Sequence, residues 1–277
     1  MIPSNKSATR RIVFKLPDEE PPSKSLKGMK PLHPDLPQIP LFVGIVGPRH
    51  SGKSVWLFNM LSSEDGMYGE AFKKDNIILY SPTKDKDPTL KKLKLTNVYG
   101  PPTSLQWLVD DIRSKQQAYM EADNMTGVLL VIDDATKLRN AWPTIEELSY
   151  VGRHDHIHVF YVAHKISAIV RGVRTQTQQW VLFCPHEESE KQWVYETYAP
   201  REFIPLFRNA FMRAWHATPH NFIYIDYEEK DKNRIYRSGF HDPLFTPEEL
   251  AIVTGTAGME DEQKEEEEEE EEESEEE

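Results

Sequence analysis

The stretch LFVGIVGPRHSGKS, residues 41–54, decides the fold. Its first six residues are apolar apart from one glycine, and they predict a buried strand of a parallel sheet. The last eight match the pattern G-x-x-x-x-G-K-[ST], in which backbone N–H groups of a glycine-rich turn surround phosphate oxygens. A helix is expected over residues 54–63. This order of strand, loop and helix predicts a nucleoside triphosphate site.

Each position of the loop has an expected contact with the nucleotide. Lys53 is expected to reach the β and γ phosphates and to act in catalysis, and the Ser54 hydroxyl is placed to hold Mg²⁺. The predicted cofactors are therefore ATP and Mg²⁺. The loop residues expected to bind them are Gly47, Pro48, Arg49, His50, Ser51, Gly52, Lys53 and Ser54.

A second apolar run, residues 128–132 (VLLVI), ends in two acids, Asp133 and Asp134. Consecutive branched aliphatic residues predict a central strand, and the carboxyl end of such a strand emerges where α/β sheets bind ligands. Asp133 is expected to hold Mg²⁺ through water, and Asp134 to polarise the attacking water as a general base. The alternative for Asp134 is a cap on the following turn.

Length and composition limit what else the chain contains. Its 277 residues give room for one α/β domain of about 200 residues plus extensions. The single cysteine, Cys184, excludes an internal disulfide, as is typical of a reducing compartment. No run approaches 18 consecutive apolar residues and the N-terminus has no apolar leader, so we expect neither a membrane span nor secretion.

Both ends of the chain differ in composition from its middle. Residues 1–37 are rich in proline and basic side chains, which predicts a disordered arm suited to phosphate contacts or to pairing with the acidic tail. Residues 258–277 hold fifteen acidic residues and one lysine and predict a disordered tail, so the rest of the chain is close to neutral. This tail is either a mimic of nucleic acid that competes for a basic surface or a solubilising extension. Residues 38–257 are the predicted ATPase domain.

Between these ends, apolar runs alternate with helical patterns. Further strands are expected at residues 76–80, 157–163 and 180–183, and a capping box at residues 103–106 (TSLQ) is expected to begin a helix. This alternation predicts an α/β fold with a mostly parallel, doubly wound sheet and helices on both faces. After two further helices, residues 221–227 and 234–237 predict a C-terminal hairpin.

Polar residues flank the strand expected at 157–163. His164 follows it directly, where ATPases with a second acid sense the γ-phosphate, and Arg153 precedes it. Arg174 and Arg171 lie in a glycine-bearing loop further on. Each arginine is either a finger offered to a neighbouring subunit or a solvated surface group.

Three histidines, His154, His156 and His158, alternate at strand spacing and raise the question of a zinc site. No cysteine has ligand spacing to them, and the one acidic partner, Asp155, falls on the opposite face. We therefore expect ordinary polar residues at a strand entrance.

Four segments together resemble the poxvirus-type genome-packaging ATPases of large DNA viruses and virophages, which belong to the FtsK–HerA superfamily of P-loop NTPases. They are residues 47–54, residues 128–134, the phrase Gly152-Arg153-His154 ahead of a strand, and Val173-Arg174 ahead of residues 180–183. The resemblance covers roughly residues 38–240. Members commonly carry Gln where His164 stands, and many carry Asp-Glu in place of Asp133-Asp134.

The resemblance implies a RecA-like fold with an added strand between the two strands that carry the Walker motifs. It further implies a homo-oligomeric ring that uses ATP to pump double-stranded DNA into a preformed capsid, with a capsid or portal-vertex protein as partner. The implied location is the virion or the host-cell cytoplasm, in a virus factory. Arg153 and Arg174 become trans-acting or sensing residues.

The residues by themselves reach only a Mg²⁺-dependent P-loop ATPase, and three classes of protein remain open at that point. A translocating motor needs a ring and DNA. A nucleotide or small-molecule kinase needs an arginine-rich lid, and the loop with Arg171 and Arg174 is only sparsely basic. A nucleotide-dependent switch would bind without turnover.

Overall fold

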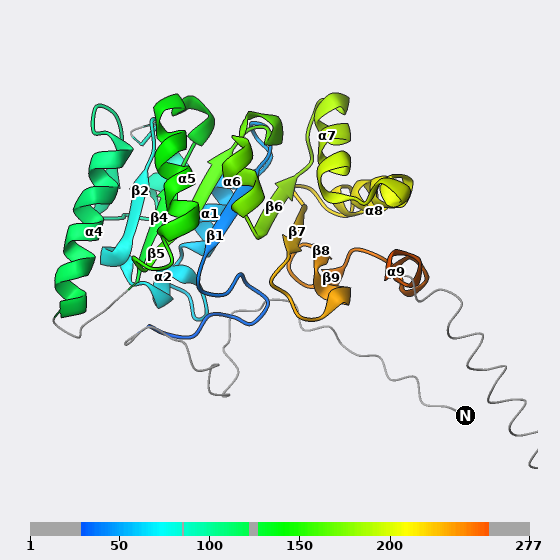
Figure 1. The fold of residues 1–277 in the computed structure, drawn as a ribbon, viewed down its shortest axis with the longest axis horizontal. Coiled ribbons are helices and arrows are strands. Elements are labelled where there is room, and N and C mark those ends of the chain that lie inside the picture. Colours follow the sequence, from blue (N-terminus) through cyan, green and yellow to red (C-terminus); the bar gives the residue numbers. More distant parts are fainter. Residues whose placement is uncertain (1–28, 85, 122–126, 255–277) are drawn as a thin grey trace, which may run out of the picture.

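The structure is a computed structural model that describes residues 29–84, 86–121 and 127–254. Within these residues one sheet has the strand order β3-β2-β4-β5-β1-β6-β7-β8-β9 (Figure 1). β1 to β6 pair in parallel, and β6 to β9 pair antiparallel. The strands are β1 Phe42–Val46, β2 Ile77–Tyr80, β3 Asn97–Tyr99, β4 Val128–Ile132, β5 Ile157–Ala163, β6 Gln179–Phe183, β7 Phe222–Asp226, β8 Tyr236–Ser238 and β9 Asp242–Pro243.

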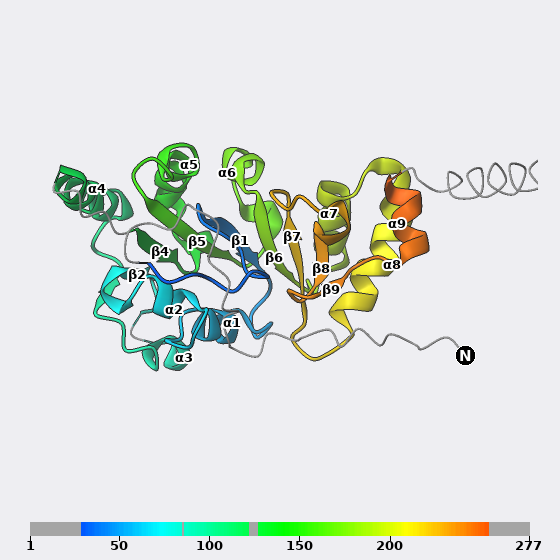
Figure 2. The same cartoon turned by 90° about the horizontal axis from the view of Figure 1, so that it is seen from below.

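Helices cover both faces of the sheet (Figure 2). α4, α5 and α6 lie on one face with α7 and α8, and α1, α2 and α3 lie on the other. Each face has its own cluster of buried apolar side chains, because parallel strands need a cover on both sides. The helices are α1 Lys53–Met60, α2 Tyr68–Ala71, α3 Pro88–Lys91, α4 Leu105–Glu121, α5 Trp142–Val151, α6 Arg171–Gln176, α7 Glu188–Tyr198, α8 Ile204–Trp215 and α9 Pro247–Thr254.

The predicted α/β fold is confirmed: the sheet is mostly parallel, helices lie on both of its faces, and antiparallel strands follow at the C-terminus. β5 lies between β1 and β4, so a strand separates the two that precede the phosphate loop and the paired acids, as the resemblance implies. Val46 pairs with Ala163, and Ile132 pairs with Tyr161. The three strands therefore end at one edge of the sheet, where α/β proteins bind ligands.

Local patterns predicted the long elements better than the short ones. β4 and β5 occupy the residues expected of them, whereas β3 and β9 are too short to carry an apolar alternation. The capping box is corrected by one residue. The Ser104 hydroxyl, rather than that of Thr103, accepts a hydrogen bond from the Trp107 N–H (3.1 Å) at the start of α4.

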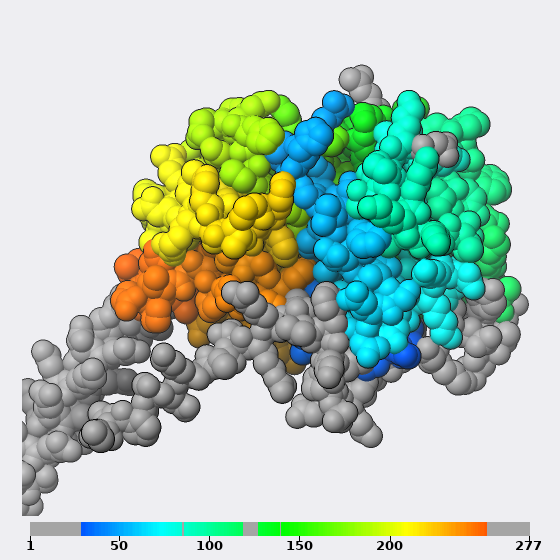
Figure 3. All heavy atoms as spheres, turned by 180° about the vertical axis from the view of Figure 1, so that it is seen from behind, coloured from blue at the N-terminus to red at the C-terminus, as the bar shows by residue number. Residues whose placement is uncertain are grey.

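The packed part of the chain begins earlier than the predicted boundary at residue 38. Leu32 and Leu36 are buried in the apolar cluster under α1 and α2, and the Tyr68 hydroxyl donates to the Pro37 carbonyl oxygen (2.8 Å). Figure 3 shows the phosphate-loop segment and α1, in medium blue, between the cyan elements and the yellow and orange C-terminal elements. Burying a leucine gains about 1.5–3 kcal/mol, which outweighs the low structural propensity of the prolines. Residues 1–28 and the acidic tail lie outside the described residues.

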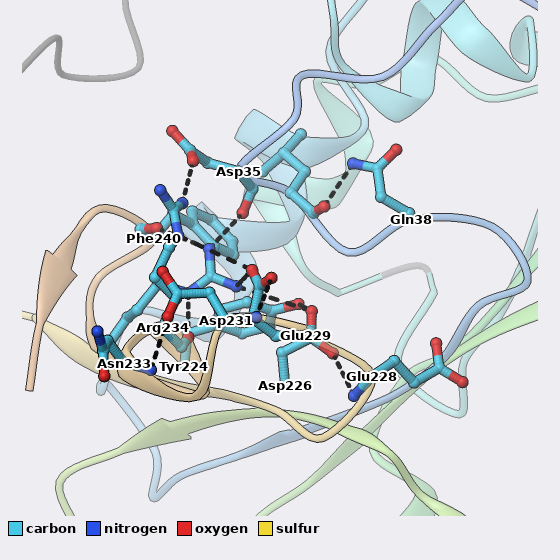
Figure 4. Close-up of polar contacts among 12 residues, drawn as sticks. Asp35, Gln38, Tyr224, Asp226, Glu228, Glu229, Asp231, Asn233, Arg234 and Phe240 are labelled. Carbon is cyan, nitrogen blue, oxygen red and sulfur yellow. Dashed lines mark hydrogen bonds and ion pairs between the residues drawn. The ribbon is translucent and has the colours of Figure 1, made fainter. Parts of the chain in front are cut away.

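Asp35 fastens this early segment to the C-terminal strands (Figure 4). Its carboxylate is bonded by the Arg234 guanidinium and lies 2.9 Å from Nδ1 of His241. His33 packs its ring edge-on against His241, with 6.3 Å between ring centroids. The contacts join segments about 200 residues apart in the sequence.

Arg237 of β8 lies beneath this contact and is only 2% exposed. Its charge is balanced by Glu229 (3.4 Å) and Asp226 (3.7 Å), and its guanidinium lies 4.7 Å from the centre of the Tyr224 ring. It also donates to backbone carbonyl oxygens, including that of Asp35 (3.3 Å). Removal of one of these carboxylates would leave a buried charge uncompensated, which is strongly destabilising.

The three alternating histidines have different surroundings. His158 is buried, its Nδ1 accepts a hydrogen bond from the Leu41 N–H (3.2 Å), and burial lowers its pKa to about 3. His156 adopts a left-handed backbone conformation (φ 51°) just before β5.

Candidate active site

The loop between β1 and α1 has a backbone form that requires glycine at two points. Gly52 has φ of 108°, a conformation that residues with a side chain rarely adopt. A Cβ on Gly47 would lie 2.6 Å from Cβ of Phe183 in β6, so a larger residue does not fit there. The Gly47 N–H donates to the carbonyl oxygen of Ala163 (3.1 Å). The loop is thus anchored between the ends of β5 and β6.

Lys53 folds back into the loop that it follows. Its Nζ donates to the carbonyl oxygens of Gly47 and Pro48, both at 2.6 Å. Burial lowers the pKa of Lys53 to about 8, although the negative charges of Asp133 and Asp134 oppose this shift. The ammonium therefore lies inside the ring of loop residues, beside two carboxylates, where a phosphate would find a cation.

Asp133 is buried at the end of β4. Its Oδ2 accepts a hydrogen bond from the Ser81 hydroxyl (2.9 Å), which follows the neighbouring strand β2. Burial raises the pKa of Asp133, the hydrogen bond from Ser81 opposes this shift, and the negative charges of Asp134 and Asp87 add to it. A cation at this carboxylate would relieve that destabilisation.

Asp134 has a strained backbone and a side chain bound on both sides. Its φ of 52° places a residue with a side chain in the left-handed region, as occurs at functional sites. Its Oδ1 lies 3.0 Å from Nε2 of His164, and Lys137 binds its Oδ2. Burial by itself would raise the pKa of Asp134, but hydrogen bonds from His164 and Lys137 lower it.

The alternative of a turn cap for Asp134 is not supported, because its side chain makes no capping hydrogen bond to the short helix that follows. The pairing with His164 joins two residues that the sequence singled out separately. The Thr136 hydroxyl accepts a hydrogen bond from the backbone N–H of His164 (3.1 Å). This bond fixes the backbone from which the His164 side chain reaches Asp134.

Asp87 is a site residue that the sequence reasoning missed. Its Oδ2 accepts a hydrogen bond from the Ser54 hydroxyl (2.9 Å), and its Oδ1 accepts from the N–H groups of Thr89 (2.8 Å) and Leu90 (3.2 Å) at the start of α3. The pattern Asp-Pro at residues 87 and 88 signals a helix start. Nothing local indicated that this cap would reach the phosphate loop.

A cavity of about 870 Å³ opens at this edge of the sheet. Of the predicted residues it is lined by Arg49, His50, Gly52, Lys53, Ser54, Asp133, Asp134 and His164. Gly47 and Pro48 line an adjoining cavity of about 290 Å³ that shares Arg49 and His164. Walls that the sequence did not predict include Thr83, Lys86, Asp87, Lys137 and His220.

The residues present fit a triphosphate and Mg²⁺. The loop offers a lysine ammonium and glycine-dependent turns, and the corner beside it offers the Ser54 hydroxyl and the carboxylates of Asp133 and Asp87, the oxygen ligands that Mg²⁺ prefers. Among the described residues no three His, Cys, Asp or Glu side chains are grouped to hold a metal by themselves. Mg²⁺ sites of this kind use one or two carboxylates and complete the shell with phosphates and water.

The two predicted arginines lie away from the cavity lining. Arg153 is exposed in the turn before β5, at the sheet edge opposite the phosphate loop. Arg174 donates to the carbonyl oxygen of Ile169 (2.7 Å), and its guanidinium lies 4.5 Å from the centre of the Trp193 ring. Within one subunit, neither is brought to the predicted phosphate site.

Comparison with known proteins gives likenesses of fold. No protein-family model and no curated protein matches the chain. The genome packaging NTPase B204 from Sulfolobus turreted icosahedral virus 2, solved with AMPPCP, is 14% identical, with TM-score 0.47 over 74% of this chain and 98% of that one. B204 from Sulfolobus turreted icosahedral virus, described as a DNA-packaging ATPase, is 15% identical, with TM-score 0.48 over 73% and 96%. EssC (ATPases 2 and 3) from Geobacillus thermodenitrificans is 12% identical, with TM-score 0.49 over 77% and 44%.

These likenesses concern the fold alone. In the part of the chain that the structure describes, no helix is both long and apolar enough to cross a membrane.

Proposed function

We propose that this chain is a Mg²⁺-dependent ATPase that couples hydrolysis to the movement of double-stranded DNA. One observation carries the ATPase: the phosphate-loop residues Lys53 and Ser54 share a single cavity with Asp133 and with the bonded pair Asp134–His164. Binding, metal-holding and water-activating groups are therefore available in one place. A site for binding alone would not need a second acid paired with a histidine.

The side chains divide the chemistry between them. Lys53 would neutralise charge on the β and γ phosphates, and Ser54 and Asp133 would hold Mg²⁺, which would supply further positive charge against the phosphates. Asp134 orients the attacking water and accepts its proton. Lys137 binds one Asp134 oxygen, and the other lies 3.0 Å from Nε2 of His164; each carboxylate oxygen has a second lone pair with which to hold a water. His164 is then placed to register whether a γ-phosphate is present.

The DNA-moving part of the proposal rests on the sequence resemblance, together with the position of β5 between the two motif strands. We place the chain in a homo-oligomeric ring that packages a viral genome into a preformed capsid, at a capsid or portal-vertex protein, in the virion or the host-cell cytoplasm. Arg153, exposed at the edge opposite the phosphate loop, is accessible to a neighbouring subunit.

The test is phosphate release from ATP by the full chain, measured with and without Mg²⁺ and with and without double-stranded DNA. Lys53→Ala is the control for contaminating hydrolysis. We expect release that requires Mg²⁺ and rises with DNA length, because a motor turns over faster on its track.

Two outcomes would contradict the proposal. Transfer of phosphate to a nucleotide or other small acceptor in place of water would identify a kinase. Tight binding of an ATP analogue, combined with no hydrolysis of ATP under any of these conditions, would identify a switch. Size measurement with an ATP analogue and DNA present tests the ring separately.

A further inference from the structure

We infer that Asp87 is a positioning residue for the Mg²⁺ of the nucleotide site, a role that rests on the proposed ATPase function. Asp87 lies in the loop that joins β2 to α3, outside both sequence motifs. Its carboxylate meets the Ser54 hydroxyl, 33 positions away, at 2.9 Å. Ser54 is the loop residue expected to hold the metal, so Asp87 is bonded to the metal-binding hydroxyl itself.

The orientation of the Asp87 carboxylate is fixed before any ligand arrives. Its Oδ1 accepts the first N–H groups of α3, from Thr89 and Leu90, and Leu90 is buried in the apolar cluster below. The other oxygen is thereby directed at Ser54. A helix cap needs only one side-chain oxygen, and Ser or Asn would supply it equally well. The hydrogen bond to Ser54 uses the second oxygen, which capping does not require.

Two negatively charged side chains meet at this corner. Asp87 and Asp133 line the same cavity. Within the described residues neither carboxylate takes part in an ion pair, and their side-chain donors are the hydroxyls of Ser54 and Ser81. By contrast, Asp134 is paired with Lys137 and His164. Two carboxylates in one cavity, each bonded to a different serine hydroxyl and neither in an ion pair, suit a divalent cation, directly or through its water.

The experiment measures binding rather than turnover. A fluorescent ATP analogue is titrated into the full chain at increasing Mg²⁺ and, separately, in EDTA, for wild type and for Asp87→Asn. Asn keeps a side-chain oxygen for the α3 cap and removes the charge. Asp231→Asn is the matched control, because Asp231 also caps a short helix with its side chain but lies outside the cavity.

We expect Asp87→Asn to need about tenfold or more Mg²⁺ for half-maximal binding, since one carboxylate of the cation environment is gone. In EDTA its affinity for the analogue should equal or exceed that of wild type, because one charge that repels the phosphates is removed. The Asp231→Asn curves should follow wild type. A higher Mg²⁺ requirement together with undiminished affinity in EDTA distinguishes a role in positioning the metal from damage to the phosphate loop, which would weaken binding under both conditions.

The inference is overturned if Asp87→Asn and wild type have the same Mg²⁺ requirement, or if the variant binds more weakly in EDTA as well. If the melting temperature shows that Asn destabilises the fold, Asp87→Ser retains the cap and replaces it. A wild type that fails to bind the analogue under any condition would instead overturn the proposed ATPase, and the two failures are therefore distinguishable.

Discussion

Asp134 is the residue whose expected role depends most on its surroundings. As a free carboxylate at a strand end it would be an available base, but here His164 and Lys137 occupy both oxygens and lower its pKa. A carboxylate with a lowered pKa is ionised at neutral pH and is a weaker base. Its main contribution is then to hold and orient the water, with His164 completing the contact.

Replacing Asp134 by Asn tests this role. We expect Asp134→Asn to bind an ATP analogue as wild type does and to hydrolyse ATP about a hundredfold or more slowly, the usual scale for a positioned base. Steady-state phosphate release and analogue binding are the two measurements. Lys53→Ala should lose binding itself. An effect confined to Asp133→Asn, with Asp134→Asn fully active, would contradict a catalytic Asp134.

At the scale of elements, β5 is held at its start by an uncharged histidine. His158 accepts the Leu41 N–H, which links β5 to the segment that enters β1, and it is buried. Its pKa of about 3 lies below the ordinary 6.5, so in this range the unfolded chain binds the proton and the folded chain does not. Stability is therefore complete above pH 6.5 and is lost as the pH falls toward 3.

The expected loss is about 1.4 kcal/mol in the free energy of unfolding for each pH unit below 6.5. Urea unfolding at pH 7.5 and pH 5.5 measures it. His158→Gln retains an acceptor for Leu41 and should show a smaller loss between these values. His154→Gln, at an exposed position in the preceding turn, should lose as much as wild type. Equal pH dependence in all three proteins would mean that His158 takes up its proton without unfolding.

The early segment is an element that the domain needs. Leu32 and Leu36 fill the cluster under α1 and α2, and Asp35 binds Arg234 and His241. Removing the segment exposes apolar surface and leaves the buried Arg237 without one of its carbonyl partners.

Two truncations separate this segment from the residues before it. Deleting residues 1–28 should leave the melting temperature unchanged, whereas deleting residues 1–37 should lower it by about 10 °C. The burial of two leucines is worth roughly 3–6 kcal/mol, and the melting temperature of a domain of this size falls by about 2–4 °C for each kcal/mol lost. Thermal unfolding by circular dichroism is the measurement. Identical melting temperatures would show that the described contacts of residues 29–37 contribute nothing.

At the scale of the whole molecule, the two arginines differ in whether their side chains are held by contacts within the subunit or are exposed. Arg174 is bound to the backbone beyond β5 and packs over Trp193, so its removal should destabilise the fold. Arg153 is exposed and is the better candidate for contact with a neighbouring subunit.

Mixing inactive variants tests that contact. Arg153→Ala and Lys53→Ala should each be inactive alone, yet their mixture should hydrolyse ATP, because some intact Lys53 sites then face intact Arg153 side chains. A finger is worth about 10³ or more in rate, so the recovery is measurable. Sizing must first show that mixed oligomers form. If they form without activity, Arg153 does not act across a boundary. Arg174→Ala, mixed in the same way, shows whether that arginine does instead.

The sequence by itself determined the parts whose residues are adjacent in the chain. The phosphate loop after β1 and the paired acids after β4 follow apolar runs that form central strands, and parallel strands end at a common edge. The ligand class, the sheet type and two of the site's walls were therefore predictable.

Only the tertiary structure decided the contacts between distant segments. Asp87 reaches Ser54, His164 reaches Asp134, and Asp35 reaches Arg234 because the strand order brings their loops together. That order is set by the apolar area buried over the whole sheet, to which no local pattern gives access. Residues 29–37 show the same limit: their composition predicted disorder, and the burial of Leu32 and Leu36 decided otherwise.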